Sequence, residues 1–257
     1  MNHSAICMTN LIRDSTKKDT SMTTLASRID HTILKAEATR PEVYKLVAEA
    51  LEHGFASVCV NGCFVADVAT ALRGSPVKAC GVAGFPLGAM KTAIKAIETS
   101  SLVKDGAGEV DFVAHIPHLL KQDFAAAKAE YLEIVKAARA VNPDVIIKVI
   151  VESAVLMKDV DAATAEARIE IACRAVRESG CDFIKTSTGF HPAGGASVEA
   201  VKLMRKHSGG IYVKASGGIR SYDDAKRMLD AGADRLGCSA GVAIVQGAGA
   251  GASGAGY

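Results

Sequence analysis

The 257-residue sequence contains no apolar run close to the ~20 residues that a membrane-spanning helix needs. Its first stretch, MNHSAICMTNLIRDSTKKDT, also lacks the uninterrupted hydrophobic segment of a signal peptide. The formal net charge is only +2, which argues against a surface for nucleic acid, since such a surface needs clustered basic residues. We therefore expect neither a membrane nor a nucleic acid among the partners of this chain.

Cysteine pairs of the CxxC type are also missing. The chain has seven cysteines, an odd number, and the nearest approach to a motif is the CxxxC of Cys59 and Cys63. This usage is typical of reduced thiols, so we expect a cytoplasmic protein.

What the sequence does contain is a repeated order in which a helical segment ends at glycine and a short apolar strand follows. It is seen at Gly54, Gly106, Gly180 and Gly232. Glycine is favoured just past a helix end because the chain there adopts a left-handed conformation. Eight strands are expected, at Arg28–Thr32, Ser57–Asn61, Lys78–Phe85, Glu109–His115, Val145–Glu152, Phe183–Thr188, Ile211–Ser216 and Arg235–Ser239.

Eight strands that alternate with amphipathic helices predict an α/β protein with a single (β/α)8 TIM barrel. A doubly wound open sheet is the competing fold, but it usually has fewer strands at this length, and no GxGxxG follows the first strand. We expect an N-terminal arm or helix over residues 1–22 and the barrel over residues 23–246. The Gly/Ala/Ser-rich residues 247–257 predict a flexible tail that ends in Tyr257.

Polar residues interrupt four consecutive predicted strands, with Asp111 on one and Lys148, Lys185 and Lys214 on the next three. Neighbouring strands lie ~4.8 Å apart, so inward side chains can meet, and the sites of such barrels lie at the carboxyl ends of the strands. A lysine here could simply pair with Asp111 or Glu152. Burying charge is costly, however, and a surplus of cations over acids favours one neutral amine with a depressed pKa. Such an amine can form a Schiff base with a carbonyl.

A separate signal points to phosphate. A glycine pair follows the seventh strand in KASGGIR (Lys214–Arg220), and Gly-Cys-Ser ends the eighth strand in RLGCSAG (Arg235–Gly241), just before a helix. These loops and a helix N-terminus form the usual phosphate site of a TIM barrel. A third glycine turn, at Gly189, can help to close this cup.

Several motifs in order carry a resemblance to a known family. They are IDHTILK (Ile29–Lys35), VAGFPLG (Val82–Gly88), GEVDFV (Gly108–Val113), IIKVIVE, DFIKTSTGF and VKASGGIR. Over residues 24 to 245 the chain resembles the deoxyribose-phosphate aldolases, a family of class I aldolases on a (β/α)8 barrel. The resemblance implies reversible cleavage of 2-deoxy-D-ribose 5-phosphate to acetaldehyde and D-glyceraldehyde 3-phosphate, with neither a metal nor a cofactor.

By the same resemblance, Lys185 matches the Schiff-base lysine and Lys214 the second lysine that tunes its pKa. Asp111 matches the acid of the proton relay, and Asp30 and Lys148 match further polar positions of the substrate pocket. The implied phosphate ligands are Gly189, Gly217, Gly218 and Ser239. The chain departs from the family at Phe190, where some members have a lysine, and Arg220 is a candidate to replace it.

Three further residues have open roles. Thr188 is expected to bind substrate, while Cys59 either lines the pocket or is a buried small hydrophobic residue. Tyr257 is either a proton shuttle for the enamine, as the resemblance suggests, or a disordered end. The expected partners are a sugar phosphate and aldehydes, and a homodimer is the oligomer that we consider.

Two rival functions remain at this point. Phosphate-binding barrels also include isomerases and synthases that use Asp/Lys acid–base pairs without a covalent intermediate, and a non-catalytic sugar-phosphate-binding protein is the other possibility. A metal-dependent aldolase is disfavoured, because the sequence shows no three-histidine cluster.

Overall fold

The structure is a computed structural model that describes the backbone of residues 24–253 and the side chains of residues 24–248. The predicted N-terminal arm, residues 1–22, and the predicted proton shuttle Tyr257 lie outside the described residues.

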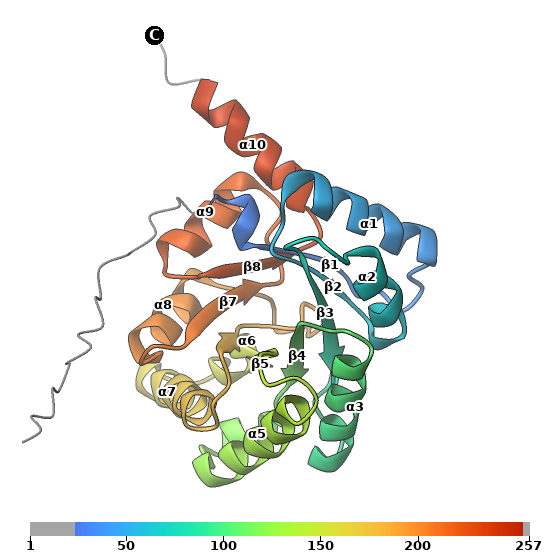
Figure 1. The fold of residues 1–257 in the computed structure, drawn as a ribbon. Coiled ribbons are helices and arrows are strands. Elements are labelled where there is room, and N and C mark those ends of the chain that lie inside the picture. The colour runs from blue at the N-terminus through green and yellow to red at the C-terminus, as the bar shows by residue number, and fades with distance from the viewer. Residues whose placement is uncertain (1–23, 254–257) are drawn as a thin grey trace, which may run out of the picture.

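Eight parallel strands close into a barrel in the order β1-β2-β3-β4-β5-β6-β7-β8, which confirms the predicted TIM barrel (Figure 1). The strands are β1 (Ile29–Ile33), β2 (Ser57–Val60), β3 (Lys78–Ala83), β4 (Glu109–Val113), β5 (Ile146–Ile150), β6 (Phe183–Lys185), β7 (Tyr212–Ser216) and β8 (Arg235–Cys238). They differ from the predicted strands only at their ends. The largest difference at a single end is at β6, which stops at Lys185; further along, the Thr188 N–H binds the Glu152 carboxylate.

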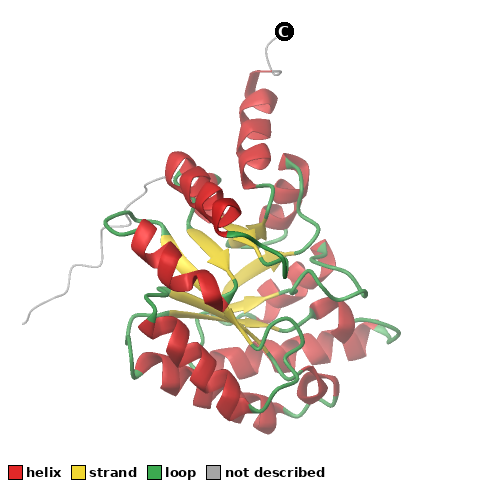
Figure 2. Ribbon diagram, turned by 90° about the vertical axis from the view of Figure 1, so that its right-hand side faces the viewer, coloured by secondary structure: helices red, strands yellow, loops and turns green. Residues whose placement is uncertain are grey.

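Helices surround the strands on the outside, as Figure 2 shows. The α-helices are α1 (Arg40–His53), α2 (Val65–Ala71), α3 (Thr92–Lys104), α4 (Ile116–Leu120), α5 (Phe124–Arg139), α6 (Ser153–Leu156), α7 (Ala162–Glu178), α8 (Val198–His207), α9 (Tyr222–Asp230) and α10 (Gly241–Ser253). Two 3-10 turns, η1 (Ala26–Arg28) and η2 (Gly62–Phe64), precede β1 and α2. No helix among residues 24–253 is long and apolar enough to cross a membrane.

The helix ends follow from local sequence signals. α1 begins with a capping box in which Thr39 and Glu42 exchange hydrogen bonds, and it ends at Gly54 with a left-handed φ of 66°. The other three glycines of the repeat are also left-handed: Gly106, Gly180 and Gly232. The repeat therefore marks the turns that lead from the helices into β2, β4, β6 and β8.

The last helix is longer than predicted. α10 continues to Ser253, past the boundary at residue 246, and projects away from the barrel in Figure 1. Gly247 is part of this helix and packs close to α9, since a Cβ atom there would lie 3.2 Å from Tyr222 Cβ. The first residue of the predicted flexible tail is thus a helix contact.

Successive side chains along each strand point alternately to the apolar core between strands and helices and to the inside of the barrel. In β4, Val110 and Phe112 face outward into the apolar core between strands and helices, whereas Glu109 and Asp111 face into the barrel. The space inside the barrel is largely filled with charged side chains, and that is unusual because buried charges need partners.

Candidate active site

A single buried carboxylate, Asp111, binds the three lysines predicted on the next three strands. Lys148 Nζ lies 2.8 Å from its Oδ1, while Lys185 Nζ and Lys214 Nζ lie 2.8 Å and 2.7 Å from its Oδ2. The two lysines predicted to interact, Lys185 and Lys214, therefore meet at the same oxygen atom. All four side chains are at most 3% exposed.

Further charged groups continue this cluster toward the amino ends of the strands. Lys214 Nζ lies 2.5 Å from Asp30 Oδ2, and Lys148 Nζ lies 2.6 Å from Glu109 Oε2. Beneath them, Arg235 donates to Asp30 and, at 2.9 Å, to Glu109 Oε1. We call these seven residues the charge cluster: Asp30, Glu109, Asp111, Lys148, Lys185, Lys214 and Arg235.

The charge cluster has four cationic side chains and three carboxylates. Burial acts against each charged form, but ion pairing outweighs it: Asp111 holds the pKa of Lys148 well above its ordinary value, and Asp111 and Asp30 raise the pKa of Lys214. Asp30 and Glu109 likewise raise the pKa of Arg235. Lys185 has a single carboxylate contact, which it shares with Lys214, so it has the fewest ion-pair partners among the four cations.

A cavity of about 370 Å³ opens above the cluster, at the carboxyl ends of the strands. Its walls include Lys185, Thr188, Phe190 and, from the ends of β7 and β8 and the loops that follow them, these residues: Ser216, Gly217, Gly218, Ile219, Arg220, Gly237, Cys238 and Ser239. The structure thus brings the predicted nucleophile and most of the predicted phosphate ligands to one space.

The loops predicted to bind phosphate pack backbone against backbone. Gly217 has a left-handed φ of 87°, and a Cβ atom there would lie 3.0 Å from Gly195 Cα and 3.3 Å from Gly189 Cα. Gly189, itself at φ 84°, lies directly behind the wall between Thr188 and Phe190. Only glycine fits this combination of conformation and close approach, and it leaves backbone N–H groups near the cavity.

The comparisons with known proteins agree with this geometry. The model of the DeoC/LacD family aldolases matches residues 24–248. The chain belongs to this aldolase family.

Among its relatives, a deoxyribose-phosphate aldolase of Caldanaerobacter subterraneus subsp. tengcongensis is 49% identical over 90% of this chain and 96% of its own length. A deoxyribose-phosphate aldolase of Thermoanaerobacter sp. is 49% identical over 86% of this chain and 96% of its own. The solved structure of deoxyribose phosphate aldolase from Aeropyrum pernix, described as tetrameric, has a TM-score of 0.77 and 33% identity and covers 86% of this chain and 89% of its own. The aldolase QR15 has a TM-score of 0.77 and 37% identity, over 88% and 96% of the two chains.

Three residues predicted to contact substrate lie away from the cavity in this aldolase. Asp30 and Lys148 are fully buried inside the charge cluster, and Cys59 is fully buried beside Cys80. None of the three is among the residues that line the cavity. For Cys59 the structure agrees with the alternative of a small buried residue.

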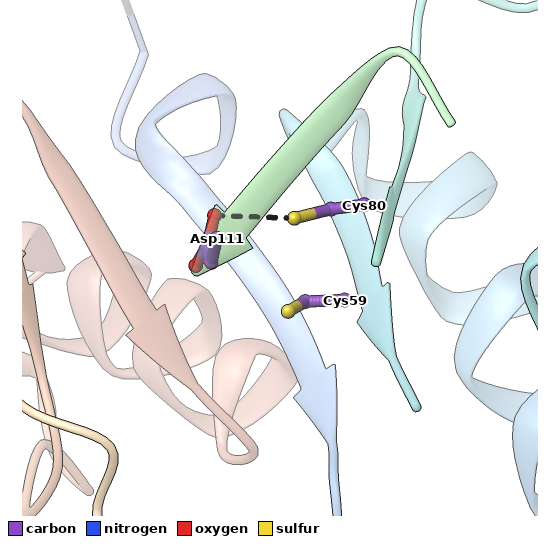
Figure 3. A group of neighbouring side chains, drawn as sticks. All are labelled: Cys59, Cys80 and Asp111. Atoms are coloured by element: carbon purple, nitrogen blue, oxygen red, sulfur yellow. Dashed lines mark hydrogen bonds between the residues drawn. The ribbon is translucent and has the colours of Figure 1, made fainter. Parts of the chain in front are cut away.

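A group of Cys59, Cys80 and Asp111 has the close spacing of metal ligands (Figure 3). The donors do not fit a cation, because Cys80 donates its S–H to Asp111 Oδ1 at 3.3 Å and burial raises the pKa of Cys80 well above its ordinary value. Asp111 is already bound by the Nζ atoms of three lysines, of which the cationic Lys148 and Lys214 would repel a metal ion. The group is better explained as part of the lining of the charge cluster.

Sequence reasoning missed the role of a residue that shapes the loop after β6. Glu152 is left-handed, with φ 52°, and only 3% exposed. Its carboxylate accepts from the Thr188 N–H at 3.1 Å and from the Thr188 hydroxyl at 2.7 Å. A non-glycine residue in this conformation costs ~1–3 kcal/mol, and such strain clusters at functional sites. The sequence suggests Glu152 only as a partner for a lysine, whereas it holds the turn that carries Gly189.

Two other features are not evident from the sequence patterns. Arg235 and Glu109 complete the charge cluster, and the signal for Glu109 is its spacing of two residues from Asp111, which puts both on one face of β4. Gly237 on β8 leaves room for Lys214, since a Cβ atom there would lie 3.1 Å from Lys214 Cε and 2.9 Å from Ser216 Cβ.

Proposed function

We propose that this aldolase catalyses the reversible cleavage of 2-deoxy-D-ribose 5-phosphate to acetaldehyde and D-glyceraldehyde 3-phosphate through a Schiff base on Lys185. One observation carries the proposal: Lys185 is the member of the charge cluster that lines the cavity, and the cluster has one more cation than carboxylates. An uncharged Lys185 leaves the cluster electrically neutral, and an uncharged amine is the form that attacks a carbonyl.

The reaction begins when Lys185 Nζ adds to the aldehyde carbon, C1, of the open-chain sugar. The adduct loses water to give an iminium ion. Removal of the proton from the 3-hydroxyl then breaks the C2–C3 bond, and the electron pair moves into the iminium to form an enamine. C3 leaves as the aldehyde of glyceraldehyde 3-phosphate, and the enamine is protonated at C2 and hydrolysed to acetaldehyde.

Asp111 is the proposed acceptor of the hydroxyl proton. It is fully buried behind Lys185, so the proton reaches it through Lys214 or through a water molecule. General base help of this kind is worth ~10²–10⁴-fold in rate. The protonation of the enamine by Tyr257 stays a prediction.

The phosphate is proposed to occupy the end of the cavity formed by Gly217, Gly218 and Ser239, near the start of α10. Backbone N–H groups and a helix N-terminus favour an anion there. Arg220 and Phe190 both line the cavity. We propose that Arg220 supplies the positive charge that Phe190 does not.

Borohydride trapping tests the proposal against an isomerase or synthase without a covalent intermediate. Incubation with acetaldehyde and sodium borohydride, followed by peptide mapping, should give an N-ethyl adduct on Lys185. Lys35 is a matched control, because it is a second lysine of the cavity wall that pairs with Glu42 at 2.6 Å. Lys185→Leu should lose the adduct and the turnover, whereas Lys35→Leu should keep both. Turnover of the sugar phosphate without any adduct on Lys185 would favour the rival enzymes, and no turnover at all would favour a binding protein.

We further infer that the enzyme works in the cytoplasm as a homodimer. The six cysteines among the described residues are free thiols, which is compatible with a reducing compartment. Light scattering of the purified protein tests the dimer, and a tetramer, as described for the Aeropyrum pernix enzyme, would contradict it.

A further inference from the structure

We propose that the Glu109–Arg235 pair, at the opposite end of the barrel from the cavity, controls whether Lys185 is an uncharged amine. This inference rests on the proposed Schiff-base function of Lys185. Glu109 and Arg235 are positioning residues in this scheme, because neither lines the cavity.

The pair lies where β4 and β8 begin. Glu109 is the first residue of β4 and Arg235 the first residue of β8, and the guanidinium joins the two strands across the barrel by its 2.9 Å bond to Glu109. Arg235 also lies over the Phe183 ring, 5.7 Å from its centroid, and its side chain is 14% exposed. Arg235 therefore closes the amino end of the barrel, beneath the other members of the charge cluster.

Two chains of alternating charge lead from this pair to the nucleophile. On one side, Arg235 contacts Asp30, and Asp30 contacts Lys214. On the other side, Glu109 contacts Lys148. Both chains end at the Asp111 carboxylate, which binds Lys185. The energy of a proton on Lys185 consequently depends on charges at the far end of the barrel, because interactions in a dry interior are little screened by salt or water.

The charge count gives the two members of the pair opposite effects. If Arg235 loses its charge, the cluster is neutral only when Lys185 keeps its proton. If Glu109 loses its charge, the cluster carries a second surplus cation, and Lys185 is driven further toward the uncharged form. If the two residues had only a structural role, their substitutions would not shift the protonation of Lys185 in opposite directions.

The titratable groups around Lys185 fall into two sets, those outside the charge cluster and those that belong to it. On the strands β2, β3, β4, β5 and β7 and in the turn after β5, these groups are Cys59, Cys80, Asp111, Lys148, Glu152 and Lys214. Glu152 is saturated by Thr188, and the two thiols are fully buried. The remaining three are the members of the charge cluster through which the pair acts.

The test measures the rate of imine trapping by acetaldehyde and borohydride on the full chain as a function of pH. Acetaldehyde is the probe because it has no phosphate, whose own ionisation near pH 6 would distort the profile. The acidic limb is the part of the profile in which the trapping rate rises with pH. Arg235→Met should move this limb to higher pH by about one unit, so the rate at a fixed pH on the limb should fall about tenfold. Glu109→Gln should move the limb to lower pH. Arg235→Lys keeps the charge and should resemble the parent protein.

The double variant Arg235→Met/Glu109→Gln keeps the inference testable if a single variant fails to fold. It restores the surplus of one cation in the charge cluster, so the acidic limb should return toward its original position. Shifts of the same sign for Arg235→Met and Glu109→Gln, or an unmoved limb in folded variants, would overturn the inference. Trapping on Lys185 in the parent protein with an unmoved limb would reject the inference alone. No trapping on Lys185 in the parent protein would reject the proposed function itself.

Discussion

Replacing Lys214 should destabilise the protein much more than replacing Lys185, although both lysines bind the same carboxylate oxygen. The perturbation is methionine at each position, which keeps the length of the side chain and removes the amine. Lys214 is fully buried and contacts Asp111 at 2.7 Å and Asp30 at 2.5 Å, whereas Lys185 has one such contact, at 2.8 Å. The two variants therefore remove different amounts of ion pairing from the same cluster.

The size of the difference follows from what each lysine leaves behind. Removing one partner of a buried ion pair typically costs ~3–5 kcal/mol. Lys214→Met belongs at the lower end, about 3 kcal/mol, because Lys148 and Lys185 still contact Asp111 when Lys214 is removed. Lys185→Met leaves three cations facing three carboxylates, so the loss of one hydrogen bond is largely offset by the buried methionine, and the change should stay within about 1 kcal/mol.

Equilibrium urea unfolding followed by circular dichroism measures both values, at one pH and one protein concentration, since subunit association would otherwise contribute. In thermal unfolding, 3 kcal/mol corresponds to a fall in Tm of about 6–12 °C for a protein of this size. Equal losses for the two variants, or a larger loss for Lys185→Met, would refute the charge distribution that we assign to the cluster.

Three other predictions concern the cavity and its support. Arg220→Gln should raise the KM for deoxyribose 5-phosphate about 2- to 5-fold, since an exposed ion pair is worth ~0.2–1 kcal/mol, and steady-state kinetics should show no change with unphosphorylated deoxyribose. Gly237→Ala should cost ~1–3 kcal/mol in unfolding free energy through overpacking, and it should lower kcat more than it changes KM because it displaces Lys214. Glu152→Ala should release Thr188 and raise KM more than it lowers kcat, with Glu152→Gln intermediate between Glu152→Ala and the parent protein.

The first two of these have a matched control. Lys35→Gln changes another cationic side chain of the cavity wall, and an equal rise in KM there would contradict a specific role for Arg220. Gly108→Ala places a Cβ atom at an ordinary 3.4 Å contact and should be tolerated, so an equal loss would remove the steric argument for Gly237. Glu152→Ala with an unchanged KM would show that the turn after β6 holds its shape without the carboxylate.

The order and inward alternation of the strands are predictable from local signals. Glycines after helices and period-2 burial are set by nearby residues, so the sequence alone places Asp111, Lys148, Lys185 and Lys214 on inward faces. Register between strands is not predictable in this way, because it depends on packing around the whole barrel. The depth of each side chain depends on register, and for this reason the sequence does not show that Asp30 and Lys148 are fully buried and outside the cavity lining.

The remaining differences arise from contacts between residues distant in sequence. Arg235 pairs with Glu109 across 126 positions, and Glu152 reaches Thr188 across 36. Neither pair shares a helix face or a hairpin, so no periodicity links its members. α10 extends past residue 246, and Gly247 lies close to Tyr222, an approach that composition alone does not show.

The charged side chains inside the barrel all come from strand residues, whereas much of the cavity wall comes from the loops that follow those strands. The residues that break the carbon–carbon bond and those that select the substrate thus lie in different parts of the chain. An enzyme engineer could exchange wall positions such as Lys35, Phe190 and Arg220 to admit aldehydes without a phosphate while leaving the reactive amine in its native surroundings. The same separation gives evolution a route to new acceptors on an unchanged catalytic base.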